Sequence, residues 1–265
     1  MRAPAAMALL SLLAVMPARP AAPAAPRTLT VFAAASLSEA FTELGGVVER
    51  ARPGLTVRFN FAGSQQLVAQ LELGAEGDVF AAADERWMRH AVALGLVDGR
   101  PTIFARNRMV VLLPASNPGR IARLQDLARP GIKLVLAAEA VPAGRYAREQ
   151  LERLASVPGM PSGFARAALA NVVSNEENVR AVVGRVQLGE ADAGLVYRSD
   201  VTPQVAPHVR VLEIPDEWGV VAAYPVAVLA GSSRQTDARA FVDTLLGSTG
   251  RRVLERHGLL APPGP

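Results

Sequence analysis

The sequence predicts an α/β protein made of two doubly wound domains, joined by two extended crossings, with a ligand cleft between the domains. Three observations support this fold class. Short β-type runs alternate with stretches of helical periodicity after residue 26, and two longer apolar runs, 109–114 and 224–229, flank a central block of that alternation. The chain contains no internal repeat and no low-complexity linker. Alternating strands and helices favour a largely parallel sheet with helices on both faces.

The first block of the chain alternates strand and helix three times. Residues 28–35 (TLTVFAAA) are mostly apolar, and residues 55–61 (LTVRFNF) alternate apolar and polar side chains, as strands do. A stretch of helical periodicity follows each strand, and Gly74 marks the end of the second helix. The predicted strands are 28–35, 55–61 and 78–82, and the predicted helices are 37–50, 65–73 and 85–94.

The alternation resumes after the first apolar crossing. The predicted strands there are 133–137 and 193–197, and the predicted helices are 143–155, 178–188, 237–246 and 250–257. Because the chain returns through a second crossing, domain I is predicted to be discontinuous, with residues 27–108 and 224–265, and domain II to span 109–223. Ligands of open α/β sheets bind beyond the carboxyl ends of the strands, so the cleft is expected where the domains meet.

Residues 1–26 have the layout of a secretory signal peptide. Arg2 supplies a positive start, residues 6–15 are almost wholly apolar, and Ala22-Pro23-Ala24 offers a cleavage site. The apolar core is too short for a membrane anchor, and the cysteine-free chain has no lipid-attachment residue. A disordered Ala/Pro tail is the alternative. The signal peptide predicts export, with the mature chain free in solution.

The charge of the chain gives little support to nucleic-acid binding. Removal of the leader takes Arg2 and Arg19 with it, so the formal net charge falls from +4 to +2. Lys133 is the only lysine, and the arginines do not cluster with aromatic residues. The roughly 240 residues that remain are half apolar, which is enough for one large or two modest domains.

Two serine-bearing turns lie where a predicted strand meets a predicted helix. Ser36 follows three alanines and has Glu39 three residues later, the spacing of a capping box. Gly63 and Ser64 follow the second strand, where glycine permits close backbone approach and Ser64 offers a hydroxyl at the positive end of a helix. Each serine can also be read as a simple cap. Together they favour an anion site at helix starts.

Two further helix starts and a tyrosine complete the candidate site. Pro142 fits the first turn of a helix, and Asn178 lies in a polar N-cap region. Tyr197 ends a predicted strand, where its hydroxyl can reach a cleft or its ring can simply pack.

The sequence resembles the molybdate-binding proteins of ABC transporters, a group within the type-2 periplasmic binding proteins. The resemblance covers nearly all of the mature chain in the family's order. The A-A-A-S-L and G-D-V-F-A-A-A-D motifs are specific. The matching segments are VFAAASLSEAF (31–41), FAGSQQLVAQLELGAEGDVFAAADERWM (61–88), VPAGRYAREQL (141–151), NVRAVVGRVQLGEADAGLVYRSD (178–200) and YPVAVLAG (224–231).

The resemblance implies a periplasmic receptor that captures molybdate, and also tungstate, and delivers it to a membrane ABC transporter permease. In that family two serine hydroxyls, backbone N–H groups and a tyrosine hydroxyl hold the oxyanion. The matching positions here are Ser36, Ser64, Ala143, Val179 and Tyr197, with Ala143 and Val179 acting through the main chain. The expected protein is a monomer without cofactor or enzymatic activity, and its ligand touches no metal ion and no counter-charge.

Three residues near these motifs bear on selectivity. Gly63 stands where many relatives carry another serine. Arg145 follows the VPAG turn and Arg180 follows Val179. Both arginines are predicted to be solvated, as lone arginines at helix starts usually are.

Other functions remain as alternatives. A receptor for sulfate, thiosulfate or another oxyanion on the same fold is the first. A secreted hydrolase is remote, because the chain has no G-x-S-x-G, S-x-x-K or H-E-x-x-H motif, and His90, His208 and His257 lie outside the serine-bearing turns. A metal-ion receptor is also weak, because the available carboxylates are explained as helix-start charges and caps; they are Asp78, Asp84, Glu176 and Glu177.

Overall fold

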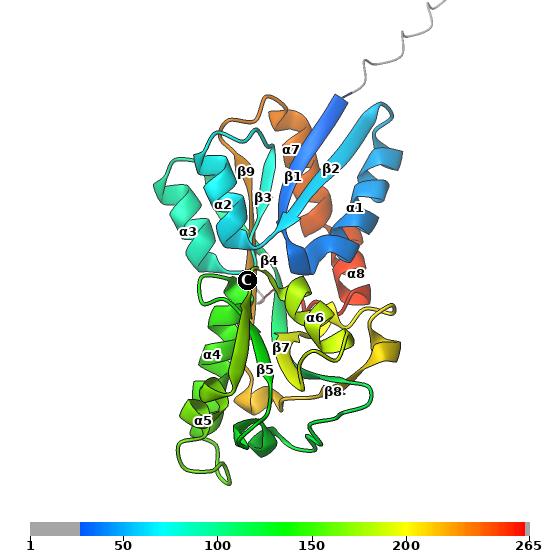
Figure 1. The fold of residues 1–265 in the computed structure, drawn as a ribbon. Coiled ribbons are helices and arrows are strands. Elements are labelled where there is room, and N and C mark those ends of the chain that lie inside the picture. The colour runs from blue at the N-terminus through cyan, green and yellow to red at the C-terminus, as the bar shows by residue number, and fades with distance from the viewer. Residues whose placement is uncertain (1–26, 263–265) are drawn as a thin grey trace, which may run out of the picture.

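The computed structural model of the protein describes residues 27–262, and the predicted signal peptide lies outside them. Within these residues, nine strands form one sheet in the order β2-β1-β3-β9-β4-β7-β5-β6, with β8 paired to β4. Figure 1 shows two lobes stacked one above the other, called lobe 1 (upper) and lobe 2 (lower) below.

Lobe 1 has parallel strands with helices on both faces. Its elements are β1 (Arg27–Ala34), α1 (Ser38–Ala51), β2 (Leu55–Ala62), α2 (Ser64–Glu72), β3 (Val79–Ala81), α3 (Glu85–Ala93), α7 (Gln235–Leu246) and α8 (Ser248–Arg256). β1 pairs in parallel with β2 and with β3. α1, α7 and α8 lie on one side of these strands and α2 and α3 on the other (Figure 1). The periodicity of α1 buries Phe41, Leu44 and Val48, which attach this helix to the core.

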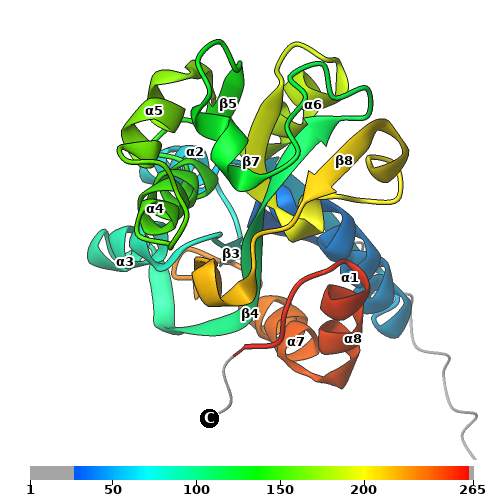
Figure 2. The same ribbon diagram turned by 90° about the horizontal axis from the view of Figure 1, so that it is seen from below.

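Lobe 2 repeats the arrangement. Its elements are β5 (Leu134–Ala137), α4 (Pro142–Ala155), α5 (Phe164–Ala170), β6 (Val172–Glu176), α6 (Val179–Gln187), β7 (Ala193–Tyr197) and β8 (Val209–Leu212). β5 pairs in parallel with β6 and β7. Figure 2 shows α4 and α5 on one side of β5 and β7, and α6 on the other. No helix within residues 27–262 combines the length and the apolar character needed to cross a bilayer.

Two strands connect the lobes, β4 (Val97–Pro114) and β9 (Val221–Leu229). β4 pairs with β9 up to Arg108, and with β7 and β8 from there to its end, so one strand belongs to both lobes. The predicted crossing at 109–114 corresponds only to the last part of β4. The first part of β4 was not predicted, because Gly99 and Pro101 make the sequence there resemble a loop. The register of the β4–β9 pairing shifts there. The predicted boundaries at 108/109 and 223/224 fall inside continuous strands, so the division into domains stays a prediction.

Two strands and one α-helix were not predicted from the sequence: β6, β8 and α5. β6 (VVSNE) contains no fully buried residue, and α5 spans only 7 residues. β8 has one buried residue, at its start. Such elements carry little apolar periodicity, and neighbours distant in sequence stabilise them.

Gly144 brings the start of α4 against the end of β5. A Cβ atom at this position would overlap the carbonyl oxygens of Ala137 and Ala138. We therefore expect Gly144→Ala to lower the free energy of unfolding by about 1–3 kcal/mol through overpacking. Gly184, inside α6, is a matched control, since a Cβ there meets no atom within 4 Å. Gly184→Ala should raise stability by about 0.5–1 kcal/mol, because alanine favours the helix. Urea denaturation of both variants measures the difference, and equal effects would contradict this role of Gly144.

Candidate ligand-binding site

A small pocket lies between the lobes. The pocket is lined by the first turns of four helices, together with Ala83 and the end of β7. The four helices are η1 (a 3₁₀ helix, Ala35–Leu37), α2, α4 and α6. All five predicted site residues line this pocket. Its lining residues are Ala34, Ala35, Ser36, Gly63, Ser64, Ala83, Val141, Pro142, Ala143, Asn178, Val179 and Tyr197. The fold thus brings Ser36 and Ser64 of lobe 1 to the same cavity as the three lobe 2 residues.

Ser36 does not cap a helix, and the predicted capping box with Glu39 is wrong. The η1 turn separates β1 from α1, which starts only at Ser38 and has no side-chain cap. This extra turn moves Ser36 away from the N-cap position. Its Oγ instead lies 3.0 Å from the Tyr224 hydroxyl, and the residue is 4% exposed.

Ser64 is the first residue of α2, and its hydroxyl reaches across the lobe. Its Oγ accepts a hydrogen bond of 3.0 Å from the N–H of Ala83, two residues after β3. The simple-cap interpretation is therefore wrong. The Gln66 side chain instead accepts a bond from the Gly63 N–H across the same turn. Because Ser64 Oγ already accepts from the backbone, its own proton is free to be donated into the pocket.

Tyr197 places a buried hydroxyl without a partner in the pocket wall. Its side chain is 1% exposed, and among residues 27–262 the hydroxyl has no hydrogen-bond partner. The ring packs edge-on against Tyr224 and Tyr146, at centroid distances of 5.7 and 6.4 Å. Burial raises the pKa of Tyr197 well above its usual value, so the hydroxyl keeps its proton. An unpaired buried donor costs free energy, and a ligand oxygen would satisfy it.

Three helix starts add backbone donors. Ser64 and Val179 are the first residues of α2 and α6, and Ala143 is the second residue of α4. The N–H groups of a first helical turn have no acceptor within the helix, and the helix dipole makes this end positive. Pro142 precedes Ala143 and lacks an N–H, and the Asn178 side chain caps α6 by accepting from Ala181. The pocket therefore joins hydroxyl donors with backbone donors.

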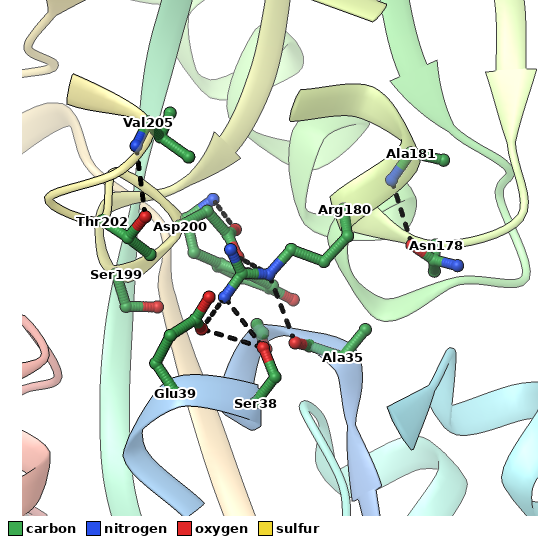
Figure 3. Close-up of polar contacts among 12 residues, drawn as sticks. Ala35, Ser38, Glu39, Asn178, Arg180, Ala181, Ser199, Asp200, Thr202 and Val205 are labelled. Atoms are coloured by element: carbon green, nitrogen blue, oxygen red, sulfur yellow. Dashed lines mark hydrogen bonds and ion pairs between the residues drawn. The ribbon is translucent and has the colours of Figure 1, made fainter. Parts of the chain in front are cut away.

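Arg180 was predicted to be solvated, and this prediction is wrong. Its side chain connects the two lobes beside the pocket. Figure 3 shows its guanidinium between Ala35, Ser38 and Glu39 of lobe 1 and Asp200 of lobe 2. Nε donates to the Ala35 carbonyl oxygen at 3.3 Å and lies 3.5 Å from Asp200 Oδ1. Nη2 donates to Ser38 Oγ at 3.1 Å and forms an ion pair with Glu39. Only the folded arrangement of the two lobes brings these groups together.

Asp200 is fully buried next to this arginine. Burial raises the pKa of Asp200 from 3.8 to about 6, while the Arg180 charge and the Tyr197 N–H oppose that shift. Its Oδ2 accepts from the Tyr197 N–H at 3.0 Å, which fixes the backbone of a pocket residue. Asp200 thus holds the backbone of Tyr197 in place, and Arg180 is the cation beside the Asp200 carboxylate.

Further contacts join the lobes on other sides. The Trp87 indole donates to the Ala140 carbonyl oxygen at 2.7 Å, and the Gln65 amide to the Glu177 carbonyl oxygen at 2.9 Å. Arg145 lies 3.4 Å from Asp84 and stacks over the Tyr146 ring at 4.1 Å. Its side chain is 32% exposed and does not line the pocket, so it is partly paired rather than fully solvated.

The carboxylates considered as metal ligands serve structural roles. Asp84 caps α3 by accepting from the Trp87 N–H, and Asp78 accepts from the Thr30 N–H and from Ser232. Within residues 27–262 no group of three or more His, Asp or Glu side chains could hold a metal ion.

Two buried polar residues behind the pocket were not predicted from the sequence. Tyr224 on β9 and Asn107 on β4 are both fully buried, and Asn107 Nδ2 lies 3.3 Å from the Tyr224 hydroxyl. Tyr224 carries a polar group at the start of the apolar run 224–229, whereas Asn107 lies between Arg106 and Arg108 and gives no such signal. The signal at Tyr224 does not reveal which pocket residue it contacts.

A pocket of donors between two lobes joined by two strands is the arrangement of a receptor for a small ligand. Comparison with known proteins agrees. The chain belongs to the family of bacterial extracellular solute-binding proteins, whose model matches residues 29–260. It is therefore a solute-binding protein and not the secreted hydrolase left open above.

Individual relatives define the similarity further. The molybdate-binding protein ModA of Mycobacterium tuberculosis H37Rv is 41% identical over 236 residues, which cover 89% of this chain and 85% of that protein. Among solved structures, the Azotobacter vinelandii periplasmic molybdate-binding protein matches with a TM-score of 0.75 at 19% identity, covering 88% and 99% of the two chains. The M. tuberculosis sulfate-binding protein SubI matches with a TM-score of 0.79 at 17% identity, covering 89% and 88%. The predicted type-2 periplasmic binding fold and the resemblance to molybdate-binding proteins are thereby confirmed.

Proposed function

We propose that this protein captures molybdate, and also tungstate, between its two lobes and delivers it to a membrane ABC transporter permease. The observation that carries this proposal is the pocket with its buried donors, above all the Tyr197 hydroxyl, which has no partner among residues 27–262. The ModA relative at 41% identity supports molybdate as the anion.

In this proposal Ser36, Ser64 and Tyr197 bind the anion through hydroxyls, and Ala143 and Val179 bind it through main-chain N–H groups. Burying a dianion without partners is very costly, so the site must offer several donors. Hydrogen bonds to a charged acceptor are the stronger class, and helix starts provide them without a cation. The side chains that line the pocket are hydroxyl, amide or apolar groups, and the proposed contacts to the anion are all uncharged hydrogen-bond donors.

The rest of the transport cycle follows from this assignment. Residues 1–26 would direct export to the periplasm, where the mature protein acts as a monomer without cofactor. Residues 27–108 and 224–265 would move as one domain and residues 109–223 as the other. Closing the domains around the anion would bury it and present the closed surface to the permease.

Isothermal titration against molybdate, tungstate, sulfate, thiosulfate and phosphate tests the proposal. We expect tight binding of molybdate and tungstate and weak or absent binding of the others. At a ligand concentration about 100-fold above Kd, the fold should gain roughly 2.7 kcal/mol, which a thermal-shift assay detects. Tight sulfate binding without molybdate binding would favour the sulfate receptor and refute the proposal.

Ser36→Ala and Ser64→Ala should each weaken molybdate binding by about tenfold or more, since a hydrogen bond to a charged group is worth about 1.5–3 kcal/mol. Each substitution also leaves one buried donor without its acceptor, the Tyr224 hydroxyl in Ser36→Ala and the Ala83 N–H in Ser64→Ala, so both should lower stability by about 1–3 kcal/mol. Ser232→Ala, which removes a buried hydroxyl distant from the pocket lining, is the control. Unchanged molybdate affinity in both pocket variants would remove these serines from the site.

A further inference from the structure

Behind Ser36 lies a chain of buried hydrogen bonds that begins on the crossing strand β4. The Arg108 N–H donates to Asn107 Oδ1 at 3.0 Å, which identifies this side-chain atom as the oxygen of the amide. Asn107 Nδ2 then faces the hydroxyls of Ser199, at 2.8 Å, and Tyr224, at 3.3 Å. An amide nitrogen can only donate, so both hydroxyl oxygens act as acceptors.

The direction of the next bond follows from the proton of Tyr224. Its hydroxyl already accepts from Asn107, and within residues 27–262 the other group in hydrogen-bond contact with it is Ser36 Oγ, at 3.0 Å. Tyr224 is fully buried, so a hydroxyl proton directed elsewhere would be unpaired. Tyr224 therefore donates and Ser36 accepts. The proton of Ser36 remains free for the pocket.

We propose that Asn107 and Tyr224 are positioning residues that set the direction of this chain of hydrogen bonds and thereby hold Ser36 as a donor to the bound anion. The inference rests on the function proposed above. Ser64 likewise accepts from the Ala83 N–H and keeps its proton for the pocket, and the Tyr197 proton has no acceptor among residues 27–262. All three hydroxyls then present protons to the ligand.

A site of this kind selects against anions that carry a proton. Molybdate and tungstate are fully deprotonated dianions at neutral pH and need only donors. Hydrogen phosphate brings an O–H group that needs an acceptor, and Ser36 and Ser64 each offer it an oxygen that already accepts one hydrogen bond, from Tyr224 and from the Ala83 N–H. The relay from Asn107 thus contributes to selectivity without touching the ligand.

A double-mutant cycle between Tyr224→Phe and Ser36→Ala tests the relay. We expect Tyr224→Phe to weaken molybdate binding about three- to tenfold, because Ser36 loses the neutral bond that orients it. The affinity for hydrogen phosphate should fall less than the affinity for molybdate, or should rise. The ratio of the two affinities therefore becomes smaller. In the Ser36→Ala background, Tyr224→Phe should change molybdate affinity little. Tyr146→Phe is the matched control, since Tyr146 is buried but does not line the pocket.

Asn107→Asp provides a second, independent variant. At a pH where the introduced carboxylate is ionised, it cannot donate to Tyr224, so Tyr224 donates to it and accepts from Ser36, which reverses the chain. Molybdate binding should fall by more than tenfold in the otherwise native protein, because Ser36 no longer donates to a charged ligand. The same change in the Ser36→Ala background measures the effect of the added charge alone, and its loss should be smaller.

The outcomes separate the two proposals. If the native protein binds no molybdate, the proposed function fails. If the native protein binds molybdate but Tyr224→Phe leaves its affinity and selectivity unchanged, the relay fails and the function stands. Equal losses with and without the Ser36 hydroxyl would also overturn the relay, because they would reflect a general structural effect.

Discussion

Replacing Arg180 by methionine is expected to lower the free energy of unfolding by about 3–5 kcal/mol at neutral pH, because it leaves a buried carboxylate without its cation. Asp200 is fully buried, and Arg180 Nε is 3.5 Å from its Oδ1. Methionine keeps much of the aliphatic length and removes the charge. The partly exposed Glu39 contributes less to this loss, since exposed pairs are worth about 0–1 kcal/mol.

The pH dependence of this loss identifies its cause. With the pKa of Asp200 raised from 3.8 to about 6, the folded state binds more protons than the unfolded state between these values. The stability contributed by Asp200 is therefore complete below pH 3.8 and declines as the pH rises through about 6. Without Arg180 the pKa of Asp200 rises further, because that arginine is the main group lowering it. The decline should then continue to higher pH.

Urea denaturation across this pH range measures both effects. The deficit of Arg180→Met should shrink towards acid pH, where Asp200 is protonated in both proteins. Adding Asp200→Asn to Arg180→Met should restore most of the lost stability at neutral pH, because it removes the unpaired charge. A deficit that is independent of pH and is not relieved by Asp200→Asn would show that packing, and not charge, is what Arg180 provides.

The second large effect concerns binding. Tyr197→Phe is expected to weaken molybdate binding by about 10- to 150-fold, the loss of one hydrogen bond to a charged ligand. The same variant should not lose stability without ligand. The native hydroxyl has no partner among residues 27–262, so phenylalanine removes an unsatisfied buried group and keeps the ring contacts with Tyr224 and Tyr146.

Titration calorimetry and urea denaturation of the unliganded protein test the two halves of this prediction separately. Tyr146→Phe is the control for a tyrosine hydroxyl outside the pocket lining. A variant that binds molybdate as tightly as the native protein would exclude Tyr197 from the site. A variant that binds poorly and also unfolds easily would assign the residue a structural role.

Local patterns were sufficient to predict most of the scaffold. The alternation of apolar and polar residues in β2 and the periodicity of α1 report which side of each element faces the core, and this information resides in neighbouring residues. The same holds for the helix starts at Ser64, Ala143 and Val179, because turns are encoded by a few consecutive residues. β6 and β8 escaped detection because their partners, β5 and β4, lie far away in sequence.

Local patterns and the family resemblance were enough to predict the α/β class, the order of most strands and helices, and five residues around an oxyanion. How those residues are used depends on contacts that form only in the folded protein. One 3₁₀ turn separates Ser36 from the N-cap position of α1, and Ser64 accepts a hydrogen bond from the Ala83 N–H, just after β3. Arg180, which was predicted to be solvated, connects the two lobes. The physical reason is that hydrogen-bond direction and charge pairing depend on groups far apart in the chain, such as Ser36 and Tyr224, which only folding brings into contact.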